Sequence, residues 1–429
     1  MNNTENLIFV SIAAYRDPQL VPTVIDCMKK ASHPERLRFG ICWQRDEQEA
    51  PLPFREDPRF RILEVNWRES KGACWARAEI MKLWNEEDWF LQLDSHCRFA
   101  DGWDQMLLRS VAETGSEKPI LSTYATPFTP GDHEVLTDGP LQIAFHGFTA
   151  EGILKLKPLH LPQHQKRERP VRARFLAAGF LFASGRFVEE VPYDPELYFL
   201  GEESAMTVRA FTHGYDLFHP AETIVWHDYG RANAKRHWDD HTETNAVRPW
   251  STLEAASSHK VQRLLNGEPV ECYGMGAVRT VEEYEAYAGL SFRARKAQEY
   301  TVRVEEPPNP KPSPDWMDWI YPWITKIELQ RTQLPEGYLK DALLWVVAIQ
   351  DEHGFDMYRR DLTPEELMPL HGDEEKIAVI CEFSSGAIPA SWIVWPLSHS
   401  QGWLQKVQGR FQDGDFAILK EDDGEEAES

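Results

Sequence analysis

An aspartate and a histidine stand two residues apart where a strongly apolar stretch of the chain ends. The stretch 89–93 (WFLQL) predicts a buried strand, and Asp94 and His96 follow it directly. Alternate side chains of an extended chain point to the same side, so both residues can reach one ion. Open α/β sheets bind their ligands beyond the carboxyl ends of the strands, where this pair would lie. The spacing therefore predicts a site for a divalent metal ion.

A second β-type stretch, residues 223–226, ends in His227, which could close the same site. A carboxylate together with imidazoles suits Mn²⁺ better than an all-oxygen magnesium site would, and Mg²⁺ stays an alternative. Taken alone, an Asp-x-His pair is as often a simple turn at the end of a strand. Beside a phosphate-bearing donor, such a cation would neutralise charge that develops on the leaving group.

Strands and helices alternate along the first hundred residues. The expected strands are 7–14, 38–43, 60–65 and 89–94, and the expected helices are 18–33 and 74–84. Alternation of this kind predicts an α/β fold, Rossmann-like, with a largely parallel sheet and helices on both faces.

Two later elements carry candidate site residues. An expected strand at 174–183 contains Gly179, and a glycine within a strand often marks the close approach of a ligand or another backbone. An expected helix at 201–212 opens with Glu202 and Glu203, whose simplest explanation is favourable placement at a helix N-terminus.

The proline-rich stretch 305–315 contains five prolines and predicts a semi-rigid linker. We therefore expect an α/β domain at 1–304 and a small β-rich accessory domain at 316–420, for which a sandwich is one arrangement. Residues 421–429 form an acidic tail.

Composition excludes several classes of protein. The net charge of −23 argues against a nucleic-acid partner, whose recognition needs a basic face, and against an anionic membrane surface. No apolar run approaches the roughly 20 residues that a membrane span needs, and the first residues lack the pattern of a signal peptide. Six cysteines without a Cys-x-x-Cys spacing predict reduced thiols and a cytoplasmic protein.

Several motifs, in order, resemble one group of enzymes. They are 11–18 (SIAAYRDP), 73–78 (ACWARA), 94–97 (DSHC), 176–182 (LAAGFLF), 198–203 (YFLGEE) and 226–227 (WH). This set, spanning about residues 1–300, resembles metal-dependent glycosyltransferases of the GT-A fold and is similar in its motifs to polypeptide N-acetylgalactosaminyltransferases. Residues 11–18 are closest to glycosyltransferase family 60, whose best-known members are cytoplasmic enzymes that add N-acetylglucosamine (GlcNAc) to hydroxyproline on a protein.

The resemblance implies an activity and a set of roles. The activity is retaining, metal-dependent transfer of GlcNAc from UDP-GlcNAc to a protein hydroxyl, with Mn²⁺ or Mg²⁺ as cofactor. His227 would be the third metal ligand beside Asp94 and His96, Gly179 would admit the donor sugar, and Glu202 would bond its hydroxyls. Asp94 and Glu202 are thus the expected catalytic residues. The remaining donor contacts are expected from Ser11, Tyr15, Gln44, Arg77, Ser95 and Arg231.

The chemistry of each side chain suggests which part of the UDP-sugar it would contact. Tyr15 would stack on the base, and either Gln44 or Asp46 would read the base edge. The fork of Arg77 suits phosphate oxygens, and Arg231 could reach the diphosphate although its spacing differs from that of related transferases. No carboxylate is placed as a nucleophile, so we expect front-face displacement in which a diphosphate oxygen takes the acceptor's proton. Asp17, before Pro18, is interpreted as a helix cap.

Other readings stay open. The same chemistry could serve another UDP-sugar, or a glycan or small-molecule acceptor, because acceptor choice depends on loops. A metallophosphoesterase also begins with Asp-x-His after a strand, but the Asn-His pair it needs is missing from the sequence. A non-catalytic sugar or protein binder could keep the fold. The expected partners are a UDP-sugar and a protein acceptor, and a homodimer is implied by analogy alone.

Overall fold

The computed structural model describes most of the chain, and every statement below concerns the described residues. These are 6–131, 135–136, 139–149, 152–160, 169–230, 234–242, 249–268, 270, 272–309, 321–334, 341–352, 354–367, 376–412 and 414–418. Most of the predicted linker and the whole acidic tail therefore lie outside the described residues.

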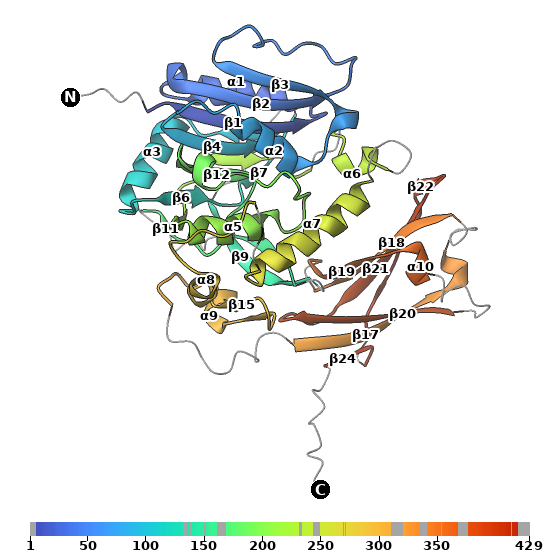
Figure 1. The fold of residues 1–429 in the computed structure, drawn as a ribbon. Helices are drawn as coiled ribbons and strands as arrows, with labels where there is room; N and C mark the ends of the chain where they lie inside the picture. Colours follow the sequence, from blue (N-terminus) through green and yellow to red (C-terminus); the bar gives the residue numbers. More distant parts are fainter. Residues whose placement is uncertain are drawn as a thin grey trace. The chain divides into compact units, whose positions relative to one another are not determined.

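An eight-stranded mixed sheet forms the centre of the N-terminal part, in the order β11-β13-β6-β12-β4-β1-β2-β3 (Figure 1). Strands β4, β1, β2 and β3 run parallel, whereas β12 is antiparallel to both β4 and β6. The strands are Ile8–Tyr15 (β1), Leu37–Arg45 (β2), Phe60–Asn66 (β3), Trp89–Asp94 (β4), Pro119–Ser122 (β6), Val171–Arg172 (β11), Phe180–Ser184 (β12) and Asp216–His219 (β13). The predicted α/β class is confirmed, with a mixed sheet whose parallel part carries the first four predicted strands.

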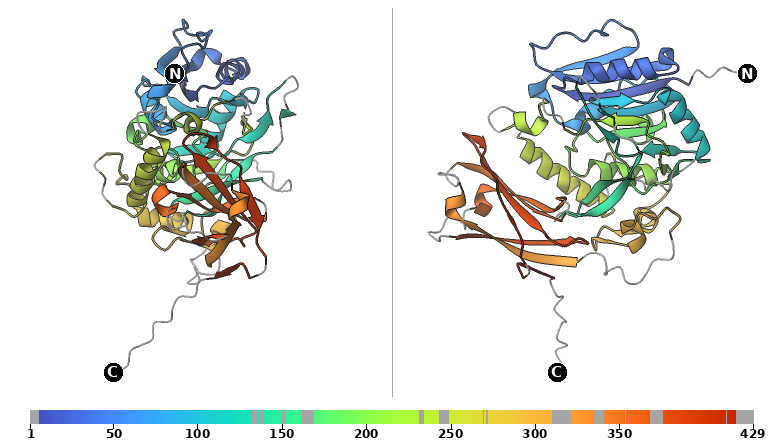
Figure 2. Two further views of the ribbon diagram at one scale, coloured as in Figure 1. Left: turned by 90° about the vertical axis from the view of Figure 1, so that its right-hand side faces the viewer. Right: turned by 180° about the vertical axis from the view of Figure 1, so that it is seen from behind.

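Helices cover both faces of this sheet, as predicted. In Figure 1 α2 (Ala73–Met81) lies in front of the strands, whereas the view from behind in Figure 2 brings α1 (Leu20–Lys30) to the front. The core beneath α1 also takes side chains from α3 (Trp103–Glu113), among them Trp103. On the α2 face, an added Cβ at Gly40 would meet Phe9 and Ile80, so a glycine there allows close packing.

Further helices follow β12 in sequence, two of them before β13. They are Phe187–Glu190 (α4), Glu202–Thr212 (α5), His237–Asp240 (α6), Trp250–Leu265 (α7), Val281–Ala288 (α8) and Glu299–Val302 (α9). Helix α8 begins at a capping box, in which Thr280 accepts from the Glu283 N–H and the Glu283 carboxylate accepts from the Thr280 N–H.

A second, four-stranded sheet has the order β5-β14-β7-β8 and was not predicted. Its strands are Cys97–Phe99 (β5), Thr126–Thr129 (β7), Val135–Leu136 (β8) and Val225–His227 (β14). Strand β5 follows β4 after only two residues, so this small sheet starts where the metal motif lies. Two short hairpins complete the list, formed by Leu141–Phe148 (β9) with Leu154–His160 (β10) and by Leu290–Ser291 (β15) with Lys296–Ala297 (β16).

The strand predicted at 174–183 begins only at Phe180, so its first half was predicted wrongly. The N–H groups of Leu176 and Ala177 donate to the hydroxyls of Thr207 and Ser122 instead of to a neighbouring strand. Because side chains satisfy this backbone, the segment can turn sharply before the strand starts. Gly179 consequently stands at the entrance of β12 and not within it.

The chain divides into two compact units. The first consists of 1–144, 157–289 and 304–310, and the second of 145–156, 290–303 and 311–429. The second unit therefore takes in two segments that precede the predicted linker, and the limits at 304 and 316 stay a prediction. The start of that linker belongs to the first unit, where the Arg174 guanidinium donates to the Glu305 carbonyl.

The second unit contains two antiparallel sheets around one hydrophobic core, which confirms the predicted β-rich character. One sheet has the order β20-β17-β24, and the other has the order β19-β18-β21-β22 with β23 also on β21. Their elements are Tyr321–Gln330 (β17), Ala342–Gln350 (β18), Asp356–Leu362 (β19), Pro364–Leu367 (α10), Lys376–Ser385 (β20), Ser391–Ser398 (β21), Gly402–Trp403 (β22), Val407–Arg410 (β23) and Phe416–Ile418 (β24). Buried Ile327 of β17 and Trp345 of β18 share this core.

Among the described residues, no helix has the length and apolar character needed to cross a membrane.

Candidate functional site

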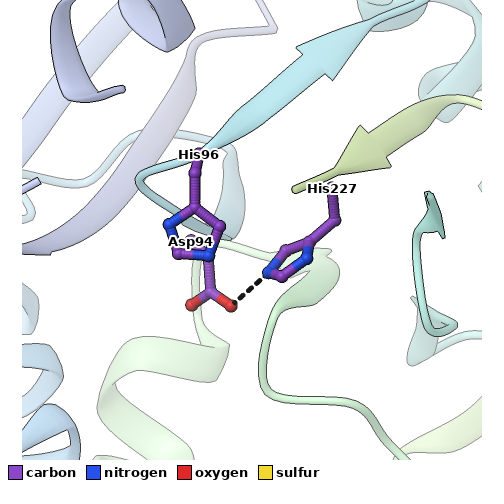
Figure 3. A group of neighbouring side chains, drawn as sticks. All are labelled: Asp94, His96 and His227. Carbon is purple, nitrogen blue, oxygen red and sulfur yellow. Dashed lines mark hydrogen bonds and ion pairs between the residues drawn. The ribbon is translucent and has the colours of Figure 1, made fainter. Parts of the chain in front are cut away.

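Strand pairing brings the three predicted metal ligands together. Asp94 ends β4, His96 lies in the two-residue link to β5, and His227 ends β14 (Figure 3). Strand β14 runs antiparallel to β5 with His227 opposite Cys97, so residues distant in sequence become neighbours. One potential ligand atom of each residue lies within 4.8 Å of the others. The two imidazole rings meet edge to face, with 4.4 Å between their centroids.

Both oxygens of the Asp94 carboxylate are held from different elements. Oδ1 accepts from Arg77 of α2 at 2.8 Å, and Oδ2 lies 3.1 Å from Nε2 of His227. Burial alone would raise the pKa of Asp94, but the His227 hydrogen bond and the charge of Arg77 hold it well below its usual range. Behind the carboxylate stands Gly179, where an added Cβ would lie 2.9 Å from Oδ2. Asp94 is therefore an ionised carboxylate in a fixed place.

His96 is oriented by a residue that the sequence did not mark for the site. Its Nδ1 lies 2.7 Å from Oδ2 of Asp17, a carboxylate that also accepts from the Ser95 hydroxyl at 2.7 Å. Ser95, predicted as a donor contact, is buried and binds Asp17. The position of Asp17 just after β1 could have revealed it, because β1 and β4 are parallel neighbours whose carboxyl ends meet.

Arg77 and Glu202 form a buried ion pair across the site. The guanidinium of Arg77 donates to Glu202 at the start of α5 as well as to Asp94, and the side chains of Arg77 and Glu202 are 5% and 4% exposed. Burial opposes the charged form, but Glu202, Tyr193 and Asp94 together raise the pKa of Arg77 further. Arg77 thus fixes two carboxylates, and its predicted contact with a diphosphate stays a prediction.

Glu203, next along α5, holds the turn that precedes Gly179. Its carboxylate accepts from the Ala178 N–H at 3.0 Å and from the Tyr124 hydroxyl at 2.7 Å. Burial raises the pKa of Glu203 to about 7, against the lowering effect of these two hydrogen bonds. From the sequence, Glu203 was expected only to be well placed at a helix N-terminus, because Tyr124 lies on a segment for which no element was predicted.

The residues predicted for the nucleotide base lie at the carboxyl ends of β1 and β2. Tyr15 ends β1, its hydroxyl donates to Asp240 of α6 at 3.1 Å, and its ring lies 5.1 Å from that of His237. Gln44 is buried in β2 and accepts from the hydroxyl of Ser70. Asp46, the alternative to Gln44, pairs with Arg16 at 3.5 Å. These contacts bring polar and aromatic side chains together at the ends of β1 and β2, and the sequence predicted some of these residues.

Helix α6 and the residue after it add further side chains to this group, which sequence analysis missed. His237 stacks on His241 at 3.7 Å, and its Nδ1 lies 2.6 Å from the Tyr198 hydroxyl. Burial, and then the neighbouring His241, lower the pKa of His237 to about 3, so this imidazole is neutral. A helix of four residues leaves no periodic signal in a sequence, which is why α6 was not predicted.

One predicted donor contact, Ser11, is not brought to this place, and another cannot be placed. Ser11 lies in the interior of β1, between Gly40 of β2 and Gln92 of β4, and is 1% exposed. Arg231 lies outside the described residues. Arg174 is buried, donates to the Glu305 carbonyl and is not part of the site.

Asp94, His96 and His227 fit a divalent cation that takes both oxygen and nitrogen ligands. They offer one carboxylate and two imidazoles, which Mn²⁺ and related transition metals accept readily. The ring nitrogen of His96 that remains after the Asp17 contact is Nε2, so a lone pair is available toward Asp94 and His227. The positions of the three side chains are thus compatible with the metal site that the sequence predicts.

Comparison with known proteins gives one family. The family model described as "Glycosyltransferase (GlcNAc)" matches residues 7–57 and 52–294, more than half of the chain. Together with this match, the mixed α/β sheet agrees with the GT-A class of fold predicted from the sequence. A search of curated proteins found no match.

Solved structures of low sequence identity are also similar. A crystal structure of GalNAc-T7 with UDP, GalNAc and Mn²⁺ is 13% identical with a TM-score of 0.45, covering 94% of this chain and 69% of that one. A structure of S. aureus TarS 1-349 is 10% identical with a TM-score of 0.37, covering 52% of this chain and 60% of that one. The same TarS fragment in complex with UDP-GlcNAc is 11% identical with a TM-score of 0.36, covering 61% of this chain and 73% of that one.

Proposed function

The chain belongs to the glycosyltransferase (GlcNAc) family, and from this premise we propose that it is a metal-dependent, retaining enzyme of the family 60 type. It transfers GlcNAc from UDP-GlcNAc to a hydroxyl on a protein acceptor, hydroxyproline by analogy. The observation that carries the proposal is the meeting of Asp94, His96 and His227 at the carboxyl end of β4. Ligands at that end of an α/β sheet lie where such folds bind nucleotides.

In this proposal Asp94, His96 and His227 hold Mn²⁺, with Mg²⁺ as the alternative. A bound cation supplies charge neutralisation for the leaving UDP. Glu202 bonds hydroxyls of the donor sugar, and its buried pair with Arg77 keeps it in one orientation. Gly179 leaves room beside Asp94, so that the donor sugar can approach the strand end. Tyr15 lies where the nucleotide base would reach the end of β1.

The reaction that we propose is a front-face displacement. The bond between C1 of the sugar and the diphosphate oxygen breaks, and the acceptor oxygen bonds to C1 on the same face. The acceptor's proton passes to the departing diphosphate, so no protein nucleophile is needed. The protein contributes positioning and fixed charges, which can supply most of such an acceleration.

The cellular setting is part of the same proposal. All six cysteines are unpaired and five of them are buried, which supports a reducing compartment and a cytoplasmic enzyme. We also propose a homodimer, by analogy, and a catalytic domain with the limits 1–304. The second unit has no assigned role in the transfer.

The experiment is a release assay with a panel of UDP-sugars, without acceptor, in Mn²⁺ and then in EDTA. We expect slow release of UDP from UDP-GlcNAc that EDTA abolishes and that Asp94→Asn abolishes while the variant stays folded. Asp101→Asn is the matched control, because Asp101 is exposed and is not among the three clustered residues.

Each result has a distinct meaning. Release from a different UDP-sugar would keep the transferase and change its donor. Release that is equal in EDTA, or equal in Asp94→Asn, would refute the metal assignment. No release together with no metal-dependent binding of any UDP-sugar would favour a non-catalytic binder.

A further inference from the structure

We propose that Asp17 is a positioning residue for the metal ligand His96. Its carboxylate accepts a hydrogen bond from the Nδ1–H of His96 and so keeps Nε2 unprotonated, facing Asp94 and His227. The inference rests on the proposed function, because it takes His96 as a metal ligand. It adds a residue outside the ligand set, on which metal affinity and geometry then depend.

The contact is short, buried and fixed on both sides. Oδ2 of Asp17 lies 2.7 Å from Nδ1 of His96, with side-chain exposures of 1% and 7%. The same oxygen accepts from the Ser95 hydroxyl at 2.7 Å, and Oδ1 accepts from the Gln19 N–H at 2.8 Å. Because each oxygen has its own donors, the carboxylate cannot turn without losing hydrogen bonds in a buried place.

The backbone around Asp17 points its side chain inward. Arg16 has a left-handed conformation with φ of 44°, which is uncommon for a residue with a side chain, and its N–H donates to the Gln44 carbonyl at 2.9 Å. Strained backbone that persists in a folded protein is often part of a functional site. This turn sends Tyr15 and Arg16 toward Asp240 and Asp17 toward His96.

A second set of contacts holds the backbone on both sides of His96. The Thr23 hydroxyl, in the first turn of α1, donates to the Ser95 carbonyl and accepts from the Cys97 N–H at 2.9 Å. Helix α1 thus holds both sides of His96, while Asp17 just before the helix holds its ring. The ring orientation and the ring tautomer therefore depend on one short segment.

The tautomer matters because only an unprotonated ring nitrogen can bind a metal. In neutral histidine the proton stays on the nitrogen that finds an acceptor, here Nδ1. A carboxylate acceptor also makes the opposite nitrogen a better ligand, and loss of such partners typically lowers metal affinity by about 10- to 100-fold. The local role of Asp17, accepting from the Gln19 N–H just before α1, is the simpler one and needs only Oδ1.

Asp17→Asn separates these two roles. The amide oxygen can still accept from the Gln19 N–H, but an amide N–H₂ now faces Nδ1 of His96. That nitrogen must then accept, so the proton moves to Nε2, where it blocks the metal. The control is Asp26→Asn, an equally conservative change on α1. Asp26 accepts from the Phe99 N–H at 2.8 Å and pairs with Lys30 at 3.1 Å, and neither contact involves His96.

The measurement is Mn²⁺ affinity of the full chain by calorimetry, with ¹⁵N NMR of the histidine rings in metal-free protein. We expect Asp17→Asn to weaken Mn²⁺ binding by about 10- to 100-fold, and Asp26→Asn to change it by less than about 3-fold. In the wild-type protein the His96 proton should reside on Nδ1, and in Asp17→Asn on Nε2. A purely structural role would not move this signature.

The outcomes distinguish the two proposals. If His96→Ala abolishes Mn²⁺ binding while Asp17→Asn binds as tightly as wild type, the positioning role is refuted and the proposed function stands. If the wild-type protein binds no Mn²⁺, both are refuted. Should Asp17→Asn fail to fold, the wild-type spectrum decides alone, because a proton on Nε2 of His96 would overturn the positioning role.

Discussion

Replacing Gly179 by alanine adds one methyl group directly against a metal ligand. The new Cβ would lie 2.9 Å from Oδ2 of Asp94 and 3.6 Å from its Cγ. The backbone of Gly179 needs no left-handed conformation, so contact with Asp94 is the main perturbation. Alanine at this position therefore tests how tightly the ligand geometry is set.

The size of the effect follows from how Asp94 is held. An ordinary carbon–oxygen contact is about 3.4 Å or more, so the carboxylate must retreat by about half an ångström. It cannot do so freely, because Arg77 at 2.8 Å and His227 at 3.1 Å hold its two oxygens. We expect overpacking to lower the free energy of unfolding by about 1 to 3 kcal/mol. We expect UDP-sugar turnover to fall by about 10- to 100-fold, because misplaced reacting groups are costly.

The assay combines Mn²⁺ calorimetry, EDTA-sensitive UDP release and thermal unfolding of the same samples. Gly147→Ala is the matched control, since its backbone is not left-handed and no atom lies within 4 Å of the added Cβ. Gly179→Ala with wild-type Mn²⁺ affinity and turnover would show that the carboxylate moves easily, and the reasoning about a fixed ligand would be wrong.

Three further predictions concern the surroundings of the site. Because the folded pKa of Glu203, about 7, exceeds its ordinary value of 4.5, its contribution is fully present below pH 4.5 and is lost as the pH rises through 7. Glu203→Gln should therefore gain up to about 3 kcal/mol over wild type between pH 5 and pH 8 in urea titrations, and equal pH dependence would contradict this. Arg77→Gln should lower the free energy of unfolding by about 3 to 5 kcal/mol, with partial recovery in the double variant with Glu202→Gln, as measured by a double-mutant cycle; additive losses would contradict coupling. Thr280→Ala should cost about 1 kcal/mol through loss of the α8 cap and leave UDP release unchanged, whereas altered release would mean that α8 affects the site.

The parallel half of the fold could be predicted because its signals are local. Strands β1 to β4 are apolar runs, with α1 between β1 and β2 and α2 between β3 and β4, and each strand appears within a few residues of its predicted place. The strand that ends in His227 was predicted, but the small sheet to which it belongs was not, because a strand of three residues such as β5 carries almost no pattern of its own. The segment before β12 was misassigned because side-chain hydroxyls replaced strand pairing there.

In the candidate site, too, local signals could be predicted and long-range contacts could not. Asp94 and His96 could be found from a strand ending, since their spacing fixes which way both side chains point. The meeting of His227 with them depends on the pairing of β14 with β5, which only the folded chain reveals. Asp17 was interpreted as a helix cap, which is wrong, because Gln19 is the N-cap of α1 and no side chain caps this helix. The Asp17 carboxylate accepts from the Gln19 N–H and lies 2.7 Å from Nδ1 of His96. The contact with His96 depends on long-range packing, which the local sequence does not show.

The charges beside the three clustered residues bear on whether an ion would bind there. Arg77 pairs with two carboxylates, those of Asp94 and Glu202, so one positive charge faces two negative ones. A carboxylate that is largely buried and only partly neutralised is unfavourable, and a cation held by Asp94, His96 and His227 would offset the remaining negative charge. The pairing of charges therefore favours a cation at this place independently of the ligand types.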